Sequence, residues 1–286
     1  ILISSAAFYM MNGNSNSNNN TAGVDSEILV TTDNGKAIIV RTLDATWADS
    51  QEYFQGDAIP EGVLKLTEGW VELQFYSGTK VILEGPVDFQ VLTENSGFLH
   101  KGKCSAYVPS HAHGFSIETS DTKIVDLGTS FGVIVDPLKS TVVNVFEGEV
   151  LLVDQSPKVN DLKLTKGMAQ LISKSGESVS ISAANEDFIS ALQLTSKINT
   201  KNIDSQRRWK QKVVEAKQDA SLLASYDFTQ YNEFPGRLQN LSSNLAEGLN
   251  GSIIGAQWSE GRWPGKKALD FKRPGDCVRI SILSKH

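Results

Sequence analysis

Two pairs of carboxylates are the residues of this sequence whose types and spacing come closest to a catalytic pattern. Glu147 and Glu149 flank Gly148, and two carboxyl groups about 5 to 10 Å apart can cleave a glycosidic bond. The same chemistry could be proposed for Glu84 and Asp88. Gly148, however, is expected to form a turn between two strands, where charged side chains face water. Because the sequence also lacks nucleophile-elbow, P-loop and dinucleotide motifs, nothing in it demands an enzyme.

One pair of histidines could be considered as metal ligands. His111 and His113 have the i, i+2 spacing that would place both imidazoles on one face of a strand. No cysteine or carboxylate lies near enough in the sequence to complete a site. An exposed loop after Pro109 is the simpler interpretation, and we expect neither a metal nor another cofactor.

The run Asp126-Leu-Gly-Thr-Ser-Phe131 could present a small polar site, with Asp126 and Thr129 held at a glycine turn. A structural role is the stronger interpretation, because an Asp before a tight glycine turn caps its own backbone amides. In this interpretation Leu127 and Phe131 fill the core. We therefore predict that the run is a signature of the fold.

Two tryptophans are candidates for ligand binding. Trp258 and Trp263 stand close together in the sequence, and an indole face can stack on a sugar ring. They could equally close the core beside the strand expected at 268–271, because large aromatic side chains dominate such cores. The sequence leaves both roles open.

The elements that must position these residues are strands. From about Ile28 to Ile181, apolar and polar residues alternate in short runs, as a strand with one buried face requires. Glycines separate these runs at intervals of mostly five to twelve residues, which leaves room for one strand and one turn each time. The expected strands include 28–30, 37–40, 63–66, 70–75, 80–83 and 87–92. The region is predicted to be all-β, with short, stacked antiparallel strands in a sandwich, a barrel or a β-helix-like coil.

A helical connector is expected at 185–220, after the β domain at 28–184. Asn185-Glu-Asp-Phe188 resembles a helix start, and the segment that follows is rich in Lys, Gln, Arg and Ala without Gly or Pro. We predict a break near 199–202. The strand pattern returns at 221–286, and these residues are too few for a β-sandwich of about 100 residues.

The overall composition argues against nucleic-acid binding. The 286 residues carry a net charge of −6 and the pI is about 5.3, so a basic face that neutralises phosphates is not expected. The basic run at 207–212 is interpreted as the solvated face of a helix. Cys104 and Cys277 are interpreted as free, buried or half-buried thiols, although the sequence leaves a bridge between them open.

The first residues are expected to be a membrane anchor. Residues 1–11 are apolar or small, fewer than the about 20 that cross a bilayer, and would be the outer end of a truncated transmembrane helix. The Asn- and Ser-rich residues 12–27 would be a polar linker. A signal-peptide remnant and a plain apolar terminus are the alternatives.

Several motifs resemble the FecR domain family. They are Leu83-Glu-Gly-Pro-Val-Asp-Phe89, His113-Gly-Phe-Ser-Ile117, Val125-Asp-Leu-Gly-Thr-Ser-Phe-Gly-Val133, Val145-Phe-Glu-Gly-Glu-Val150 and Lys166-Gly-Met-Ala169. The signature residues are Glu84, Gly85, Pro86, Asp126, Leu127, Gly128, Thr129, Phe131 and Gly132. The resemblance covers roughly 28–181. It implies a regulatory domain outside the cytoplasm that senses a protein partner in the cell envelope, in proteins where a cytoplasmic anti-sigma segment precedes one transmembrane helix.

The C-terminal residues 221–286 look like the first strands of a LamG or concanavalin-A-like jelly roll. The resemblance rests on Tyr226-Asp-Phe228, Asn250-Gly251, Gly265-Lys-Lys-Ala-Leu-Asp-Phe271 and Gly275-Asp-Cys-Val-Arg-Ile280. It implies a fold that often binds carbohydrate, with calcium in some members, and it makes Trp258 and Trp263 the candidate ligand-binding residues.

Together these observations predict a non-catalytic sensor of the bacterial inner membrane, single-pass, with this portion in the periplasm or cell envelope. Its partners would be an envelope protein and the membrane, and possible involvement in sigma-factor-linked signalling follows from the resemblance. A carbohydrate-binding envelope protein and a purely structural envelope protein are the alternatives.

Overall fold

The computed structural model describes residues 34–48, 52–136, 140–154, 161–175, 177–219, 221–228, 235–242 and 249–280. The predicted anchor, the polar linker and the strand expected at 28–30 lie outside these residues. Within the described part, none of the helices combines the length and the apolar character that a membrane span needs.

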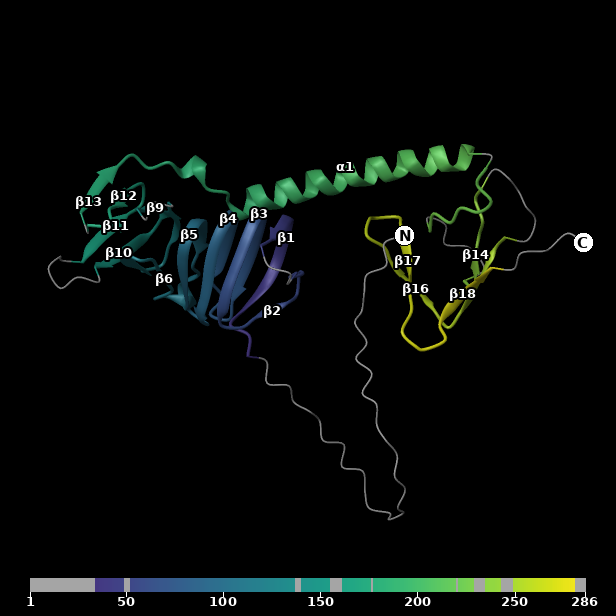
Figure 1. Cartoon of the computed structure of the whole chain (residues 1–286), viewed down its shortest axis with the longest axis horizontal. Coiled ribbons are helices and arrows are strands. Elements are labelled where there is room, and N and C mark those ends of the chain that lie inside the picture. The colour runs from purple at the N-terminus through teal and green to yellow at the C-terminus, as the bar shows by residue number, and fades with distance from the viewer. Residues whose placement is uncertain are drawn as a thin grey trace, which may run out of the picture. The chain divides into compact units, whose positions relative to one another are not determined.

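The N-terminal part of the described chain is a β domain (Figure 1). Its strands are β1 (Ala37–Trp47), β2 (Ala58–Ile59), β3 (Gly62–Phe75), β4 (Lys80–Thr93), β5 (Ser96–Tyr107), β6 (Ser116–Glu118), β7 (Thr122–Asp126), β8 (Ser130–Val135), β9 (Thr141–Glu147), β10 (Glu149–Asp154), β11 (Leu162–Thr165), β12 (Ala169–Ile172) and β13 (Ser178–Ile181). Two short 3-10 helices, η1 (Ser110–Ala112) and η2 (Asn185–Asp187), complete it. The prediction of a mainly β region is confirmed.

The sheet divides into two branches at β5. One edge of β5 pairs with β4, which continues through β3 and β1 to β2. The other edge is shared, because residues 96–98 pair with β6 and residues 102–107 pair with β8. One branch then runs through β7, β10 and β11, and the other through β9, β12 and β13. All described strand pairs of this domain are antiparallel except β5 with β6.

Both branches contribute to one hydrophobic core. Four fully buried phenylalanines lie in it, and the Phe75 ring packs edge-on against Phe115 at 5.0 Å and against Phe89 at 6.4 Å. The fourth, Phe131, comes from β8. Burying side chains of this size supplies the largest single contributions to such a core, about 1.5–3 kcal/mol each.

Two of the expected strand breaks are bulges inside long strands, so the prediction of uniformly short strands is wrong here. The expected strands on either side of Gly69 form one strand, β3, and those around Gly85 form β4, with register shifts at these points. A Cβ on Gly69 would lie 2.2 Å from the Asp44 carbonyl oxygen, and one on Gly85 would lie 2.7 Å from the Glu68 nitrogen. These glycines permit close backbone approach at a bulge rather than a turn.

One continuous helix, α1 (Ala191–Gln218), follows the β domain. Ser190 caps it, since its hydroxyl accepts from the Gln193 amide while the Gln193 side chain accepts from the Ser190 amide. The predicted break near 199–202 is wrong. Asn and Thr lower helix propensity by only a fraction of a kcal/mol, about 0.7 at most, and the Thr200 hydroxyl donates to the Ser196 carbonyl instead of interrupting the helix.

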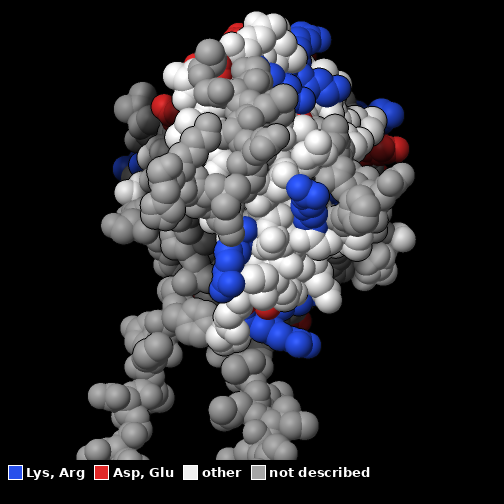
Figure 2. All heavy atoms as spheres, turned by 90° about the vertical axis from the view of Figure 1, so that its right-hand side faces the viewer, with Lys and Arg blue, Asp and Glu red and all other residues white. Residues whose placement is uncertain are grey.

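The C-terminal region forms two small antiparallel sheets. One contains β14 (Arg237–Leu238), β15 (Gly251–Ile254) and β18 (Cys277–Ile280), and the other contains β16 (Gln257–Glu260) and β17 (Lys267–Asp270). On the face shown in Figure 2, Lys and Arg side chains stand out among uncharged residues. The jelly-roll assignment stays a prediction.

Both cysteines are free thiols, as interpreted from the sequence. Cys104 is buried in β5, and Cys277 is half-buried in β18. Burial raises the pKa of the Cys104 thiol to about 12.

Candidate binding pocket at the start of the helix

The predicted signature run forms a capped turn between β7 and β8. Asp126 is fully buried and accepts hydrogen bonds from the Gly128 amide at 2.8 Å and from the Thr129 hydroxyl. The predicted capping role of Asp126 is therefore confirmed, and Phe131 fills the core as expected. The same prediction for Leu127 is wrong, because this side chain is 42% exposed. Strand β7 buries every second residue up to Asp126, so the next residue points outward.

The end of the signature run also determines what can pack on the face of the sheet opposite the main core. Gly132 on β8 leaves room for the Phe188 ring, because a Cβ at this position would lie 2.4 Å from that ring. Phe188 is 5% exposed and packs edge-on against Phe146 of β9 at a centroid distance of 5.3 Å. These contacts hold the segment that leads into α1 against the sheet.

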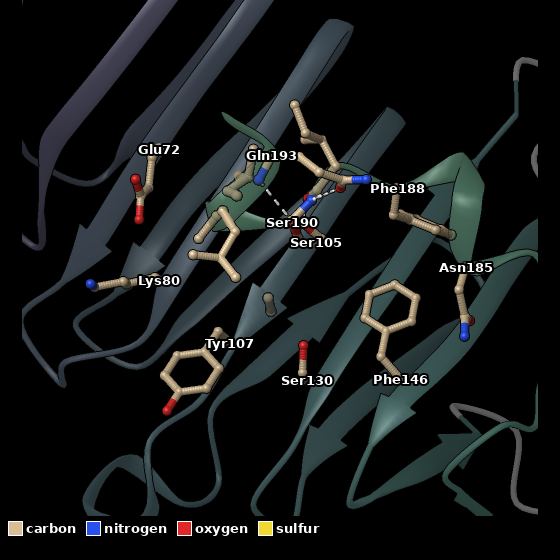
Figure 3. A pocket seen from close by; sticks show the side chains of 15 residues that line it. Glu72, Lys80, Ser105, Tyr107, Ser130, Phe146, Asn185, Phe188, Ser190 and Gln193 are labelled. Carbon is tan, nitrogen blue, oxygen red and sulfur yellow. Dashed lines mark hydrogen bonds between the residues drawn. The ribbon is translucent and has the colours of Figure 1, made fainter. Parts of the chain in front are cut away.

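A pocket of about 800 Å³ lies between this face of the sheet and the start of α1 (Figure 3). Its lining is mostly apolar and consists of Glu72, Lys80, Ile82, Ser105, Ala106, Tyr107, Ser130, Phe146, Asn185, Phe188, Ile189, Ser190, Ala191, Leu192 and Gln193. Glu72 and Lys80 lie at one end of the pocket, and Phe146 and Phe188 lie at the other. The pocket therefore offers one charged end and one aromatic end.

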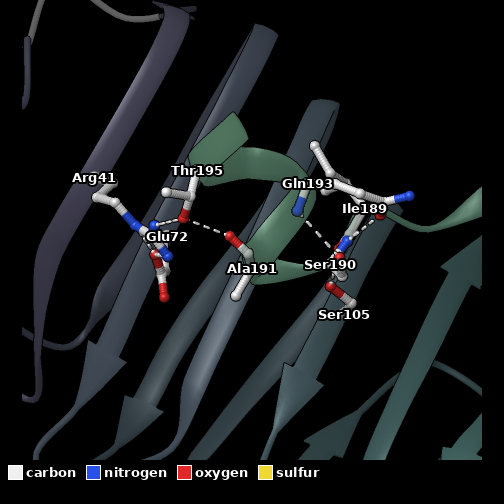
Figure 4. Close-up of polar contacts among 8 residues, drawn as sticks. All are labelled: Arg41, Glu72, Ser105, Ile189, Ser190, Ala191, Gln193 and Thr195. Carbon is white, nitrogen blue, oxygen red and sulfur yellow. Dashed lines mark hydrogen bonds and ion pairs between the residues drawn. The ribbon is translucent and has the colours of Figure 1, made fainter. Parts of the chain in front are cut away.

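An ion pair with a buried carboxylate fastens the N-terminal end of α1 to the sheet (Figure 4). Glu72 of β3 is fully buried, and its Oε2 accepts from the Nε and Nη2 of Arg41. Arg41 also donates through Nη1 to the Thr195 hydroxyl, which donates to the Ala191 carbonyl at 2.7 Å. The second oxygen of Glu72, Oε1, has no hydrogen-bond partner among the described residues.

Further contacts support the same junction. The Ser105 hydroxyl donates to the Ile189 carbonyl at 3.1 Å. Leu194 of α1 is fully buried in a small cluster with Leu43 and Ile82 of the sheet. Since polar and apolar contacts both hold the first two turns of α1, the pocket has a fixed wall on the helix side.

The signature residues Glu84, Gly85 and Pro86 lie on β4, outside the pocket lining. Glu84 pairs with Lys103 at 3.0 Å, and Lys103 donates to the Asp187 carbonyl at 2.6 Å, so the pair supports the segment that precedes α1.

The candidate carboxylate couples are engaged in separate ion pairs. Asp88 pairs with Lys101 at 3.2 Å, whereas its proposed partner Glu84 pairs with a different lysine. Glu149 pairs with Lys163 at 2.5 Å. Glu147 is exposed beside Gly148, whose φ of 79° forms the expected turn. These contacts assign the four carboxylates structural or solvated positions.

The two histidines do not share a strand face. His111 lies in η1, and its ring approaches Gly78, while the His113 Nδ1 lies 4.0 Å from the Asp126 Oδ2. Both are exposed, in agreement with the loop interpretation. Across the described ranges, no three His, Cys, Asp or Glu side chains group in a way that could hold a metal ion.

The two candidate tryptophans make contacts within the chain. The Trp258 Nε1 donates to the Pro235 carbonyl at 2.8 Å. Trp263 packs on Trp209 of α1 at 5.4 Å, and the Lys266 ammonium lies 4.7 Å and 5.0 Å from the centroids of Trp209 and Trp263. Desolvation and the neighbouring Arg262 lower the pKa of Lys266. Sugar stacking by these tryptophans stays a prediction.

Sequence reasoning did not single out the residues that build the pocket. Glu72 alternates with the buried residues of β3, a pattern typical of a solvent-facing position. The available signal was the capping box before α1, which marks where the helix begins but not which face of the sheet it covers.

Comparison with known proteins identifies one region of the β domain. Residues 66–151 match the family model described as FecR protein. No curated protein matches the chain. Two crystal structures of candidate anti-sigma factors from Parabacteroides distasonis are similar, with TM-scores of 0.38 and 0.37 and identities of 18% and 17%. Each similarity covers 44% of this chain and 61% of the other, so the match spans less than two thirds of those proteins. Within the β domain, residues 66–151 are therefore similar to FecR proteins.

Proposed function

We propose that the chain is a non-catalytic regulatory sensor whose FecR domain binds a protein of the cell envelope through the pocket at the start of α1. The observation that carries this proposal is the position of the pocket. Much of its floor comes from β3, β4, β5, β8 and β9, which lie within or overlap the matched residues 66–151. A volume of about 800 Å³ falls in the range of binding sites, about 300–1,000 Å³.

The rim of the pocket supports a protein partner. Leu192 is 84% exposed and Tyr107 is 57% exposed, although both carry large apolar surfaces. Clustered exposed apolar side chains beside a concave surface mark interaction sites. Aromatic residues such as Tyr107 are also enriched where proteins bind one another.

We further propose that the chain is held at the bacterial inner membrane, with the FecR domain in the periplasm. The apolar run at 1–11 and the polar run at 12–27 support this arrangement, and so does the FecR match. We also propose that the chain takes part in sigma-factor-linked signalling, which the FecR match supports. Protease accessibility in spheroplasts tests the location, and protection of the β domain would contradict it.

Site-specific photo-crosslinking in the native host tests the sensor proposal. A benzophenone amino acid is placed at Tyr107 or Leu192 at the pocket rim, or at Phe54, which is 62% exposed and does not line the pocket. We expect the two rim positions to crosslink to the same envelope protein and Phe54 not to do so. Equal crosslinking at all three positions, or no crosslinked protein at either rim position, would refute the proposal.

The carbohydrate-binding alternative depends on Trp258 and Trp263. Both are half-buried and contact other parts of the chain, so the described contacts favour the pocket. A glycan array decides between the two. Saturable glycan binding that Trp258→Ala or Trp263→Ala abolishes would support the alternative.

A further inference from the structure

We propose that the pocket binds the C-terminal end of an apolar peptide, with the terminal carboxylate at Lys80, an amide N–H at Glu72 and apolar side chains against Phe146 and Phe188. This inference deepens the proposed function, on which it rests, by naming the chemistry that the pocket recognises. The argument begins at the charged end of the pocket.

Glu72 supplies an unused hydrogen-bond acceptor. The residue is fully buried and lines the pocket, and Arg41 occupies only its Oε2. Its Oε1 is buried and has no partner among the described residues. A buried acceptor without a donor is costly for the folded state. A hydrogen bond from a ligand N–H to Oε1 therefore stabilises the complex more than a hydrogen bond to a solvated oxygen would.

Lys80 supplies an unused positive charge beside this acceptor. The register of β3 with β4 pairs Glu72 with Ile82 and Gln74 with Lys80, so Lys80 lies diagonally next to Glu72 on the same face. Lys80 is half-buried, and its ammonium makes no ion pair within the described ranges. Arg41 already balances the charge of Glu72. The net charge at this end is positive, and an anionic group complements it.

The opposite end is aromatic. Phe146 and Phe188 lie across the pocket from Glu72 and Lys80 (Figure 3), and Ile82 and Ile189 add apolar surface to the lining. An apolar body fits this wall, because removing it from water there is favourable.

These requirements together describe one class of ligand. It carries an anionic group, a hydrogen-bond donor close to that group and an apolar body. The last residues of a peptide with apolar side chains combine all three, because the terminal carboxylate and the amide N–H of the last residue are separated by one carbon. A fatty acid offers the anion and the apolar body but no N–H for Glu72. A peptide interior offers the N–H but no anion for Lys80.

The test is calorimetric titration of the whole chain with three probes. The first is the free acid of acetyl-Ala-Ala-Leu-Phe, the second is the same peptide with an amidated C-terminus, and the third is dodecanoate. We expect the free acid to bind at least tenfold more tightly than the amide or dodecanoate. Equal affinity for acid and amide, or tighter binding of dodecanoate, overturns the proposal, as does the absence of saturable binding at millimolar peptide.

Two lysine variants make the test specific. Lys80→Met keeps the apolar stem and removes the charge, and it should weaken the free acid at least tenfold while leaving the amide unchanged. Lys65→Met is the matched control, because Lys65 is an exposed residue of β3 that does not line the pocket. An equal effect of the two variants overturns the proposal. If the rim positions crosslink to an envelope protein but the free acid does not bind, the sensor function stands and only the peptide assignment fails.

Discussion

The contact between Gly132 and Phe188 predicts that one added methyl group loosens the start of α1. In Gly132→Ala the new Cβ would lie 2.4 Å from the Phe188 ring, much closer than the about 3.5–4.0 Å at which carbon atoms attract. Phe188 is 5% exposed and also contacts Phe146, so its ring must move within a packed site. Overpacking of this kind costs about 1–3 kcal/mol.

A double-mutant cycle separates this clash from a general effect of alanine. Phe188→Ala alone removes a buried ring and should lower the free energy of unfolding by about 3–5 kcal/mol. When Phe188 is already Ala, Gly132→Ala meets no ring and should cost almost nothing. We therefore expect the double variant to be more stable than the sum of the single effects by about 1–3 kcal/mol. Urea unfolding followed by far-UV circular dichroism measures all four proteins.

Gly62→Ala in β3 is the matched control. A Cβ at Gly62 meets no atom within 4 Å, so this variant should be neutral or stabilised by about 0.4–1 kcal/mol through the unfolded chain. If the effects of Gly132→Ala and Phe188→Ala add to within about 0.5 kcal/mol, the Phe188 ring does not lie over β8 as described. That result would also remove the aromatic end of the pocket.

Four further predictions concern the signature turn and the cysteines. Asp126→Ala should destabilise the fold by about 1–3 kcal/mol because the buried Thr129 hydroxyl and the part-buried Gly128 amide lose their acceptor; chemical unfolding measures this, and no change would contradict the capping role. Leu127→Ala should change stability by less than about 1 kcal/mol, whereas Phe131→Ala should cost about 3–5 kcal/mol, and equal costs would contradict their different exposure. At pH 8 a thiol reagent should label Cys277 and spare Cys104 in the folded protein but label both in urea. Because the pKa of Cys104 rises from 9.0 in the unfolded chain to about 12, its contribution to stability should be constant below pH 9 and decrease between pH 9 and 12.

Much of the strand content could be predicted because alternation has a simple physical cause. Val71, Leu73 and Phe75 are buried on one side of β3, and the period of two in the sequence identifies them directly. The long bent strands could not be predicted in the same way. A glycine such as Gly69 is compatible with a turn or with a bulge, and the choice depends on how closely another strand, here at Asp44, approaches it.

The pocket could not be predicted because it depends on which face of the sheet α1 covers. Alternation correctly places Glu72 on the face opposite the main core, and on most sheets that face meets water. Here Arg41 and the first turn of α1 cover it. Such a contact joins residues that are more than 100 positions apart in the sequence, and no local pattern encodes it.

The pocket and the attachment of α1 depend on the same side chains. Glu72 lines the pocket and also holds Arg41, which holds Thr195 of the helix. Leu192 and Gln193 of the first turn belong to the pocket wall. A ligand that fills the pocket therefore contacts both the sheet and the helix, and it stabilises the arrangement in which they are joined. By linkage, docking of the first turn strengthens ligand binding by the same coupling free energy by which ligand binding strengthens docking of the turn, and a change that undocks the turn weakens binding by at most this amount. If a ligand occupies the pocket as proposed, the start of α1 is thus the element that it contacts between the sheet and the rest of the chain.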